Sequence, residues 1–263
     1  MDLFDLTMPL DWEWMPDEVF PTTTHFLIAP RQHPEKGLTM GNETGTCLLL
    51  PSQFEELRKT TRVHELRPEQ LFLRDAAVVT LPAAAGQALE PGDVESALAA
   101  AEIAAGDALL LRTGWGDRVD ALRGTDRYVR ESPHFTAEAA TFLATAMDRY
   151  ETELLLTDTA VIAMPDRHLG PQWADMLPRP GPWPSVEAKA YLRGYTADRA
   201  AEDWAADLAL ARAHKVVVRK LVNCGVLPDG RLKVIVAPLH LVRAIGATCR
   251  VIALHESADA AAA

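Results

Sequence analysis

Short apolar runs alternate with helix-like segments through the middle of the chain, and this alternation is the feature that most limits the possible folds. Strands and helices of these lengths, taken in turn, are typical of α/β proteins. The segments predicted from periodicity, helix composition and capping residues are, in chain order, a strand over Leu71–Leu81, a helix over Val94–Ala105, a strand over Ala108–Arg112, a helix over Thr136–Tyr150 and a strand over Glu153–Leu156.

The flanking segments extend the same pattern but add antiparallel pairs. Before the alternating region we expect a short strand near Leu3–Leu6, a strand over Thr46–Leu50 and a short helix over Pro51–Thr60; after it, a helix over Arg199–His214 and strands over Val216–Leu221, Leu232–Pro238 and Cys249–Leu254. The last two strands are joined as a hairpin, which makes them antiparallel. We therefore predict one compact β/β/α domain over residues 1–263 whose sheet is mixed, not doubly wound and parallel.

Three segments carry no usable period. Residues 1–45 are rich in Pro, Thr and aromatic residues and are expected to form an arm laid over other parts of the molecule. Residues 165–185 combine many prolines with two tryptophans and predict a lid loop, because long irregular loops more often cover a site than fill space. The alanine-rich tail over residues 256–263 is expected to be disordered.

Charge and cysteine content restrict the partners and the compartment. The chain has 37 acidic and 26 basic residues, for a net charge of −11, so nucleic acid and anionic membrane surfaces are poor partners and a small molecule is favoured. Three cysteines without metal-type spacing favour a reducing compartment. No basic and apolar leader and no long apolar run is present, so we expect a cytoplasmic protein without a membrane segment.

General motifs do not assign a function. The chain has no glycine-rich phosphate loop, no CxxC, no HExxH and no GxSxG, so no cofactor is expected. The eight histidines are scattered, and each is more simply explained as a surface or capping residue than as a catalyst.

Several segments, in the same order along the chain, resemble the cyclase family that includes bacterial kynurenine formamidase and isatin hydrolase. These segments are DLT at Asp5–Thr7, ETGTCLLLPSQF at Glu43–Phe54, LLLRTGW at Leu109–Trp115, TDTA at Thr157–Ala160, and the closing VRKLVNCGVLPDGRLKVIVAPLHLV with RVIAL. The resemblance covers nearly the whole chain. It implies the family fold, a small-molecule substrate and a homodimer in which the arm of one subunit reaches toward the site of the other.

The family's most specific run, His-x-Gly-Thr-His-x-Asp-x-Pro-x-His, is altered here. In the family two histidines and the aspartate bind a divalent metal, and the last histidine acts as a base. The histidine positions are Glu43, Cys47 and Gln53 in this chain, and the aspartate position is Leu49. An ungapped alignment places the family's remaining ligands, a histidine and a glutamate, on Asp207 and Arg219.

These departures predict a site without a metal. Leucine offers no lone pair, and a guanidinium has none to give while it adds positive charge beside the ion. In place of the ion, Arg219 between Glu43 and Asp207 would supply a fixed positive charge with five donors, suited to a carboxylate, a phosphate or a developing oxyanion.

Each candidate residue also has a simpler explanation. Glu43 would serve as an acid or base at the pocket mouth, or is a solvated loop residue. Cys47 would be a nucleophile, or a small buried apolar residue. Asp207 would move protons, or belongs to a solvated helix face. The predicted catalytic residues are Glu43, Asp207, Cys47 and His33, and the predicted substrate-binding residues are Gln53, Arg219, Thr46, Trp12, Trp14, Trp173, Trp183 and Arg31.

Three functions follow from this site. The first is metal-independent acid/base ring closure of an aromatic small molecule in bacterial secondary metabolism, of the Pictet-Spengler or aldol type. The second is a metal-dependent amide hydrolase of the kynurenine formamidase type, with altered ligands at Glu43, Cys47 and Asp207. The third is a binding protein without catalysis.

Overall fold

A closed, mixed β-sheet forms the centre of the molecule. The computed structural model describes residues 1–10, 23–27, 35–39, 44–123, 125, 127–164 and 202–256. The main sheet contains β1 (Asp2–Asp5), β4 (Cys47–Leu49), β5 (Arg74–Thr80), β7 (Ala108–Arg112), β9 (Leu154–Thr157), β10 (Val216–Arg219), β11 (Gly230–Pro238) and β12 (Gly246–His255). Its order is β1-β12-β11-β5-β7-β9-β10-β4, and β4 also pairs with β12, which closes the sheet into a barrel.

The mixed character of the sheet is confirmed by the strand directions. β5, β7, β9 and β10 run parallel to their neighbours in this group. The pairs that β11 makes with β12, and that β4 makes with β10 and β12, are antiparallel. The parallel strands therefore bring their carboxyl ends to one edge of the barrel, where loops can carry functional side chains.

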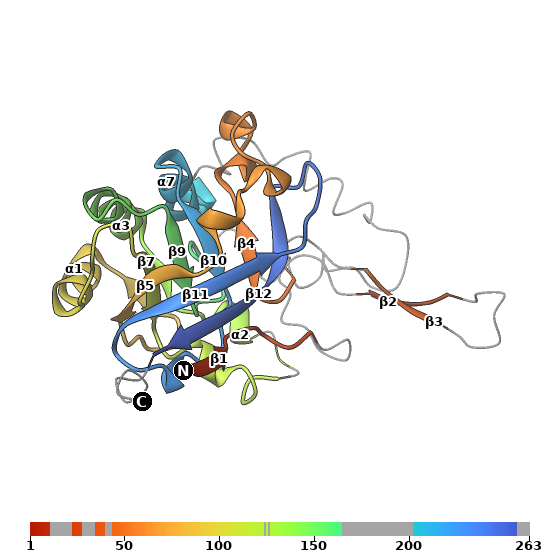
Figure 1. The fold of residues 1–263 in the computed structure, drawn as a ribbon, viewed down its shortest axis with the longest axis horizontal. Coiled ribbons are helices and arrows are strands. Elements are labelled where there is room, and N and C mark those ends of the chain that lie inside the picture. The colour runs from red at the N-terminus through yellow and green to blue at the C-terminus, as the bar shows by residue number, and fades with distance from the viewer. Residues whose placement is uncertain are drawn as a thin grey trace.

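The barrel is filled and covered by two separate apolar layers. Alternate residues such as Leu110, Val218 and Val251 belong to a large apolar cluster inside the barrel. The residues between them on β5, β7, β9 and β10 pack against helices α1 (Pro91–Ala100), α3 (Ala137–Arg149) and α7 (Ala205–Arg212). In Figure 1 these helices lie together along one side of the sheet. This arrangement is the β/β/α architecture expected from the sequence.

Short elements complete the described chain. Two further two-stranded sheets pair β2 (Thr23–Leu27) with β3 (Glu35–Thr39) and β6 (Ala88–Leu89) with β8 (His134–Phe135). The 3₁₀ helices are η1 (Pro51–Gln53), η2 (Glu55–Leu57), η3 (Val63–Glu65), η4 (Pro68–Gln70), η5 (Gly116–Arg118) and η6 (Cys224–Val226), and α2 spans Arg127–Arg130. No helix in the described part of the chain has the length and apolarity that crossing a bilayer requires.

Some predicted boundaries were wrong for local reasons. The short helix expected over Pro51–Thr60 is two 3₁₀ turns. The strand expected from Leu71 begins at Arg74, because Leu73 has a φ of 52° and interrupts the extended chain. Helix α1 starts at Pro91 and ends at Ala100, since Ala101 is extended. Residues 11–22, 28–34 and 40–43 of the expected arm lie outside the described residues, as do the whole expected lid and the tail after Glu256.

Candidate functional site

The candidate site lies where β4 begins and where β9 and β10 end. Cys47 on β4 is directly opposite Arg219 on β10 and, on its other side, directly opposite Thr248 on β12. Directly opposed residues of an antiparallel pair share a face and have Cβ atoms about 4.5–5.5 Å apart. Cys47 is fully buried and Arg219 is 1% exposed. The structure thus brings together two of the predicted site residues that are far apart in sequence.

Leu49 lies two residues further along the same face of β4. It is opposite Val217 on β10 and Gly246 on β12, and it is buried. A Cβ on Gly246 would come within 2.8 Å of the Leu49 Cδ2 atom. The leucine side chain therefore packs over this glycine, and an apolar group occupies the place next to Cys47.

Asp207 is held at the same edge by helix α7. Leu210 of α7 and Val217 of β10 belong to one apolar cluster, so the first turn of α7 lies toward the carboxyl end of β10. Asp207 is 7% exposed, and its Oδ2 atom accepts a hydrogen bond of 2.8 Å from the Ala163 backbone amide. The alternative of a solvated helix face is therefore wrong for Asp207. Its neighbour Asp203, one turn earlier, is also buried.

Thr46 connects three segments at the site. Its hydroxyl accepts a hydrogen bond of 2.8 Å from the Met8 amide and donates one of 2.7 Å to the Lys220 carbonyl. Thr46 is fully buried. The hydroxyl thus fastens the N-terminal segment and the end of β10 to the start of β4, and binding of substrate by Thr46 stays a prediction.

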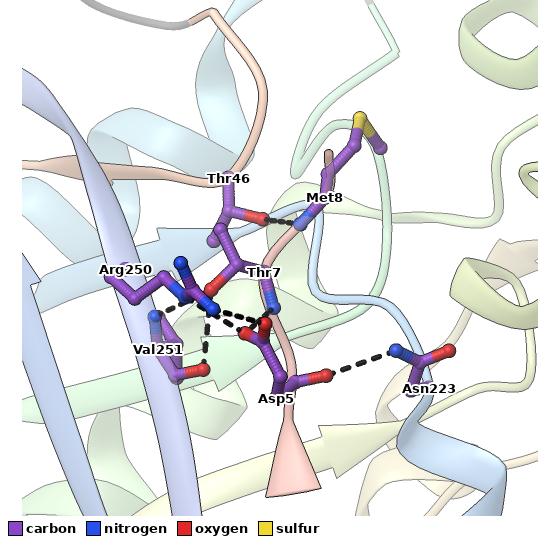
Figure 2. A network of polar contacts seen from close by, with 7 residues as sticks. All are labelled: Asp5, Thr7, Met8, Thr46, Asn223, Arg250 and Val251. Carbon is purple, nitrogen blue, oxygen red and sulfur yellow. Dashed lines mark hydrogen bonds and ion pairs between the residues drawn. The ribbon is translucent and has the colours of Figure 1, made fainter. Parts of the chain in front are cut away.

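The DLT segment anchors the N-terminal strand beside Thr46, as Figure 2 shows. Arg250 donates to both carboxylate oxygens of Asp5, at 3.2 and 2.6 Å. The Thr7 hydroxyl donates to the Val251 carbonyl and accepts from its amide. Partial burial would raise the pKa of Asp5, but the hydrogen bonds from Thr7 and Arg250 outweigh it and hold the pKa below its ordinary value. The DLT segment, which carries part of the family resemblance, therefore has a structural role, because it fastens the N-terminal strand to β12.

Asp158 is a buried carboxylate that the sequence reasoning did not select. Its oxygens accept hydrogen bonds from the Thr113 amide and hydroxyl and from the amides of Gly114 and Gly116. Burial raises the pKa of Asp158, and these donors offset only part of the effect. Asp158 joins the turns that follow β7 and β9, and its signal in the sequence was a polar TDT directly after an apolar strand.

Lys220 was also missed. It follows Arg219 at the end of β10, is fully buried, and has a φ of 61°. The signal that could have found it is an Arg-Lys pair closing an apolar strand. Burial raises the pKa of the Cys224 and Cys249 thiols well above its ordinary value, which disfavours the thiolate at these two positions.

Of the remaining predicted site residues, the structure describes only Gln53. Gln53 ends η1, is half-buried, and lies in a turn that contacts α7. The predicted site residues that lie outside the described part of the chain are Glu43, His33, Arg31, Trp12, Trp14, Trp173 and Trp183.

A comparison with models of known protein families assigns the chain to one family. The family model described as "Putative cyclase" matches residues 4–162, which is more than half of the chain. The chain belongs to the cyclase family. No curated protein matches the chain in sequence.

Solved structures of cyclase-like proteins share the fold. An isatin hydrolase bound to the product analogue thioisatinate is 15% identical, with a TM-score of 0.66 over 97% of this chain and 93% of that chain. Isatin hydrolase A from Labrenzia aggregata, bound to benzyl benzoate, is 20% identical, with a TM-score of 0.64 over 97% and 94%. A "potential metal-dependent hydrolase with cyclase activity" is 16% identical, with a TM-score of 0.62 over 97% and 99%.

The residues at the family's metal position do not fit a divalent ion. Leu49 is an apolar side chain packed on Gly246, and Arg219 brings a guanidinium to the cross-strand neighbour of Cys47. Guanidinium repels a cation and cannot coordinate it. Within the ranges that the structure describes, no three His, Cys, Asp or Glu residues gather in a way that could hold a metal ion.

Proposed function

We propose that this cyclase-family protein closes a ring in an aromatic small molecule by acid/base catalysis without a metal. The observation that carries the proposal is the direct opposition of Cys47 and Arg219, with Leu49 beside them. A fixed guanidinium at this place supplies positive charge without coordinating water, so it favours substrate anchoring and charge stabilisation over activation of water for hydrolysis.

The buried groups have separate tasks in such a step. Arg219 holds an acidic group of the substrate or the oxygen on which negative charge develops. Asp207 and Glu43 are the groups that move the proton. In an imine-type closure, an aromatic carbon attacks the iminium carbon, one C–C bond forms, and the carboxylate then removes the proton from the attacking carbon. In an aldol-type closure, the carboxylate removes the proton next to one carbonyl and Arg219 stabilises the enolate oxygen. The enolate carbon then attacks a second carbonyl carbon of the same molecule, the C–C bond of the ring forms, and the oxygen of that second carbonyl takes the proton back from the carboxylic acid.

Turnover of a defined panel of compounds tests this proposal. Arylethylamines with aldehydes, and aromatic polyketide-like diketones, are incubated with the purified protein, and cyclic products are followed by mass spectrometry. We expect at least one cyclic product, unchanged by a metal chelator, and its loss in Asp207→Asn or Glu43→Gln. Asp75→Asn is the matched control, because Asp75 lies on the surface in an ion pair with Lys233. Unchanged turnover in both site variants contradicts the assignment.

A metal-dependent hydrolase is the second candidate, favoured by the solved structures of isatin hydrolases on this fold. Metal analysis of the purified protein and isatin hydrolysis with added Mn²⁺ or Zn²⁺ separate the two. Stoichiometric metal together with metal-dependent hydrolysis would establish the hydrolase and refute the metal-independent ring closure.

We also propose that the protein acts as a homodimer. In the described part of the chain, β2 and β3 form a sheet of their own and pair only with each other. A single two-stranded sheet is marginally stable in water, so cover by a second subunit would stabilise it. Sedimentation velocity of the full chain tests this state, and a monomer at micromolar concentration contradicts it. A cytoplasmic location and an origin in secondary metabolism stay predictions.

A further inference from the structure

Four strands place one row of side chains across the candidate site. Arg219 on β10 is opposite Cys47 on β4, and Cys47 is opposite Thr248 on β12. Leu239 directly follows β11, and its amide donates to the Thr248 carbonyl at 3.0 Å, so it continues the β11–β12 ladder opposite Thr248. Directly opposed residues of antiparallel strands share a face. The row therefore consists of Arg219, Cys47, Thr248 and Leu239, and the sequence did not point to the last two.

The row opens toward solvent at its β11 end. Cys47 and Arg219 are almost completely buried, whereas Thr248 is 9% exposed and Leu239 is 49% exposed. Ala247, which precedes Thr248 on β12, belongs to the interior apolar cluster, so strand alternation turns Thr248 away from the barrel interior. A ligand that enters from the open end therefore meets the apolar side chain of Leu239 first and the Thr248 hydroxyl next.

The Thr248 hydroxyl has its only proton committed to the protein. It donates to the Thr44 carbonyl at 2.9 Å. A hydroxyl has one donor and two acceptor lone pairs. Among the residues that the structure describes, none donates a hydrogen bond to this oxygen. While the bond to Thr44 is kept, the Thr248 oxygen can therefore accept a hydrogen bond from a ligand but cannot donate one.

Two other threonines on the same strands use their hydroxyls differently. The Thr46 and Thr7 hydroxyls each donate to one backbone carbonyl and accept from one backbone amide. Both hydroxyls join segments of the chain in both directions, and for Thr7 both bonds are to Val251 on β12. The Thr248 hydroxyl fastens the chain in one direction, which leaves its acceptor side for a ligand.

The two ends of the row suit opposite hydrogen-bonding groups. The guanidinium of Arg219 has donors alone, and in the proposed function it holds an acidic group of the substrate. Thr248 presents an acceptor two positions along the row, where the Cβ atoms are about 9–11 Å apart. An aromatic ring with an acidic group on one side and an N–H or O–H group on the other matches both ends.

We propose that Thr248 is a substrate-binding residue, whose hydroxyl accepts a hydrogen bond from an N–H or O–H group of an aromatic acid. The inference rests on the proposed function, in which Arg219 holds the acidic group, and it names a second group of the substrate. An N–H donor corresponds to the amine of an imine-type closure, and an O–H donor to the phenol or enol of a polyketide in an aldol-type closure.

NMR titration of the full chain with 4-aminobenzoate, 4-hydroxybenzoate and 4-methylbenzoate tests this contact. The three ligands have similar shapes, and at about pH 7 each carries one carboxylate charge and an uncharged substituent, so Arg219 attracts them alike. We expect the amino or the hydroxyl compound to bind at least about threefold more tightly than the methyl compound, as one neutral hydrogen bond provides. The tighter of these two compounds identifies the donor that is recognised.

Thr248→Val removes the hydroxyl and keeps the branched shape of the side chain. We expect it to abolish the preference for the donor ligand, while 4-methylbenzoate binds within about twofold of wild type. Thr248→Ser keeps the hydroxyl and should keep the preference, and Thr248→Ala replaces the valine variant if that variant does not fold. Thr7→Val is the matched control, because it also removes a threonine hydroxyl bonded to the β12 backbone but lies outside the row.

The preference for the donor ligand distinguishes binding from a structural role. If Thr248 served only to fasten Thr44, Thr248→Val would lower the melting temperature without changing the ratio of the affinities. Equal binding of the three ligands to wild type, no binding of any, or a preference that survives the loss of the hydroxyl overturns the inference.

The same titrations separate this inference from the proposed function. If the three ligands bind equally and all lose affinity in Arg219→Gln, the Thr248 contact fails and the anchoring role of Arg219 stands. If the donor preference depends on Thr248 while Arg219→Gln leaves every affinity unchanged, the anchor fails and the Thr248 contact stands. Ring closure is judged separately, by the turnover of Asp207→Asn.

Discussion

Cys47 on β4 and Arg219 on β10 are direct cross-strand partners although 172 positions separate them in the sequence. In the resemblance to the cyclase family these are the positions of a metal-binding histidine and a metal-binding glutamate. The two departures from the family pattern are therefore in contact with each other. A guanidinium at this place is compatible with an anionic ligand where the family has a cation.

Restoring two carboxylates should create a metal site. Leu49→Asp combined with Arg219→Glu places carboxylates two residues along β4 from Cys47 and directly across from it, which is within reach of one ion. We expect Zn²⁺ to raise the melting temperature of the double variant by several degrees, with micromolar or tighter affinity, because a ligand that binds only the folded state stabilises it.

The isosteric amides are the control for this design. Leu49→Asn with Arg219→Gln has similar side chains but no added carboxylate, and we expect no shift of its melting temperature with Zn²⁺. A double carboxylate variant that folds and shows no Zn²⁺-dependent shift would mean that these positions do not face a common point.

Thr46→Val should destabilise the protein by about 2–3 kcal/mol, because it leaves the buried Met8 amide and Lys220 carbonyl without their hydrogen bonds. Thr46→Ser keeps the hydroxyl and should cost about 1 kcal/mol, for the lost methyl group. Urea denaturation, with an unchanged slope, measures both. Equal losses in the two variants would show that packing, not the hydroxyl, holds the N-terminal segment.

The parts of the fold that were predicted correctly have local signals. β7 has the predicted bounds because ALLLR is a closed apolar run. α3 lies within one residue of its predicted bounds at each end, because Thr136 caps it and accepts from the Ala139 amide at 3.1 Å. The closure of the barrel by β4 and β12 had no such signal, since it joins Cys47 to Thr248 across the whole chain. Strand partners depend on tertiary packing and are not encoded in any short window.

The candidate site also contains residues that a local sequence pattern predicted and residues whose place depends on tertiary packing. The positions at which this chain keeps the family's run, Gly45, Thr46 and Pro51, located the start of β4 and led to Cys47, and the alignment with the family led to Arg219. The burial of Asp207 could not be predicted, because the face of a helix that is covered depends on its neighbours. Lys220 was missed because its left-handed backbone, with a φ of 61°, interrupts the alternation that the sequence pattern assumes for a regular strand.

Asp158→Asn should cost about 3 kcal/mol of stability at neutral pH. An amide offers one acceptor oxygen, so its NH₂ group would face either the Thr113 donors or those of Gly114 and Gly116. Circular dichroism in urea at neutral pH measures the loss. A cost below about 1 kcal/mol would contradict the role of Asp158 in joining the two turns.

The same variant tests the pKa of Asp158. Burial raises the pKa in the folded state above the ordinary value of 3.8, so the folded state binds this proton more tightly than the unfolded chain does. The contribution of Asp158 to the free energy of unfolding then falls as the pH rises from about 3.8 to the folded pKa. We expect the stability gap between wild type and Asp158→Asn to widen as the pH is lowered through this window. A gap that narrows instead would mean that the four donors outweigh burial.

Gly116→Ala should be among the most damaging conservative changes in the chain. A Cβ there would lie 2.0 Å from the Leu221 carbonyl oxygen and 3.0 Å from the Asp158 Cβ, and the first of these is backbone that cannot move aside. Because Leu221 directly follows Arg219 and Lys220, relief of the clash would displace the site. We expect a stability loss of about 3 kcal/mol or more, seen as a melting temperature lower by about 6–10 °C.

Gly92→Ala provides the comparison. Gly92 lies in α1 with nothing within 4 Å of its added Cβ, and alanine favours a helix over glycine by about 0.5–1 kcal/mol. We expect this variant to melt at or above the wild-type temperature. If Gly116→Ala melted within about 2 °C of Gly92→Ala, the turn after β7 would not press on Leu221, and the contacts of Lys220 with Thr46 and Thr159 would be enough to hold the end of β10.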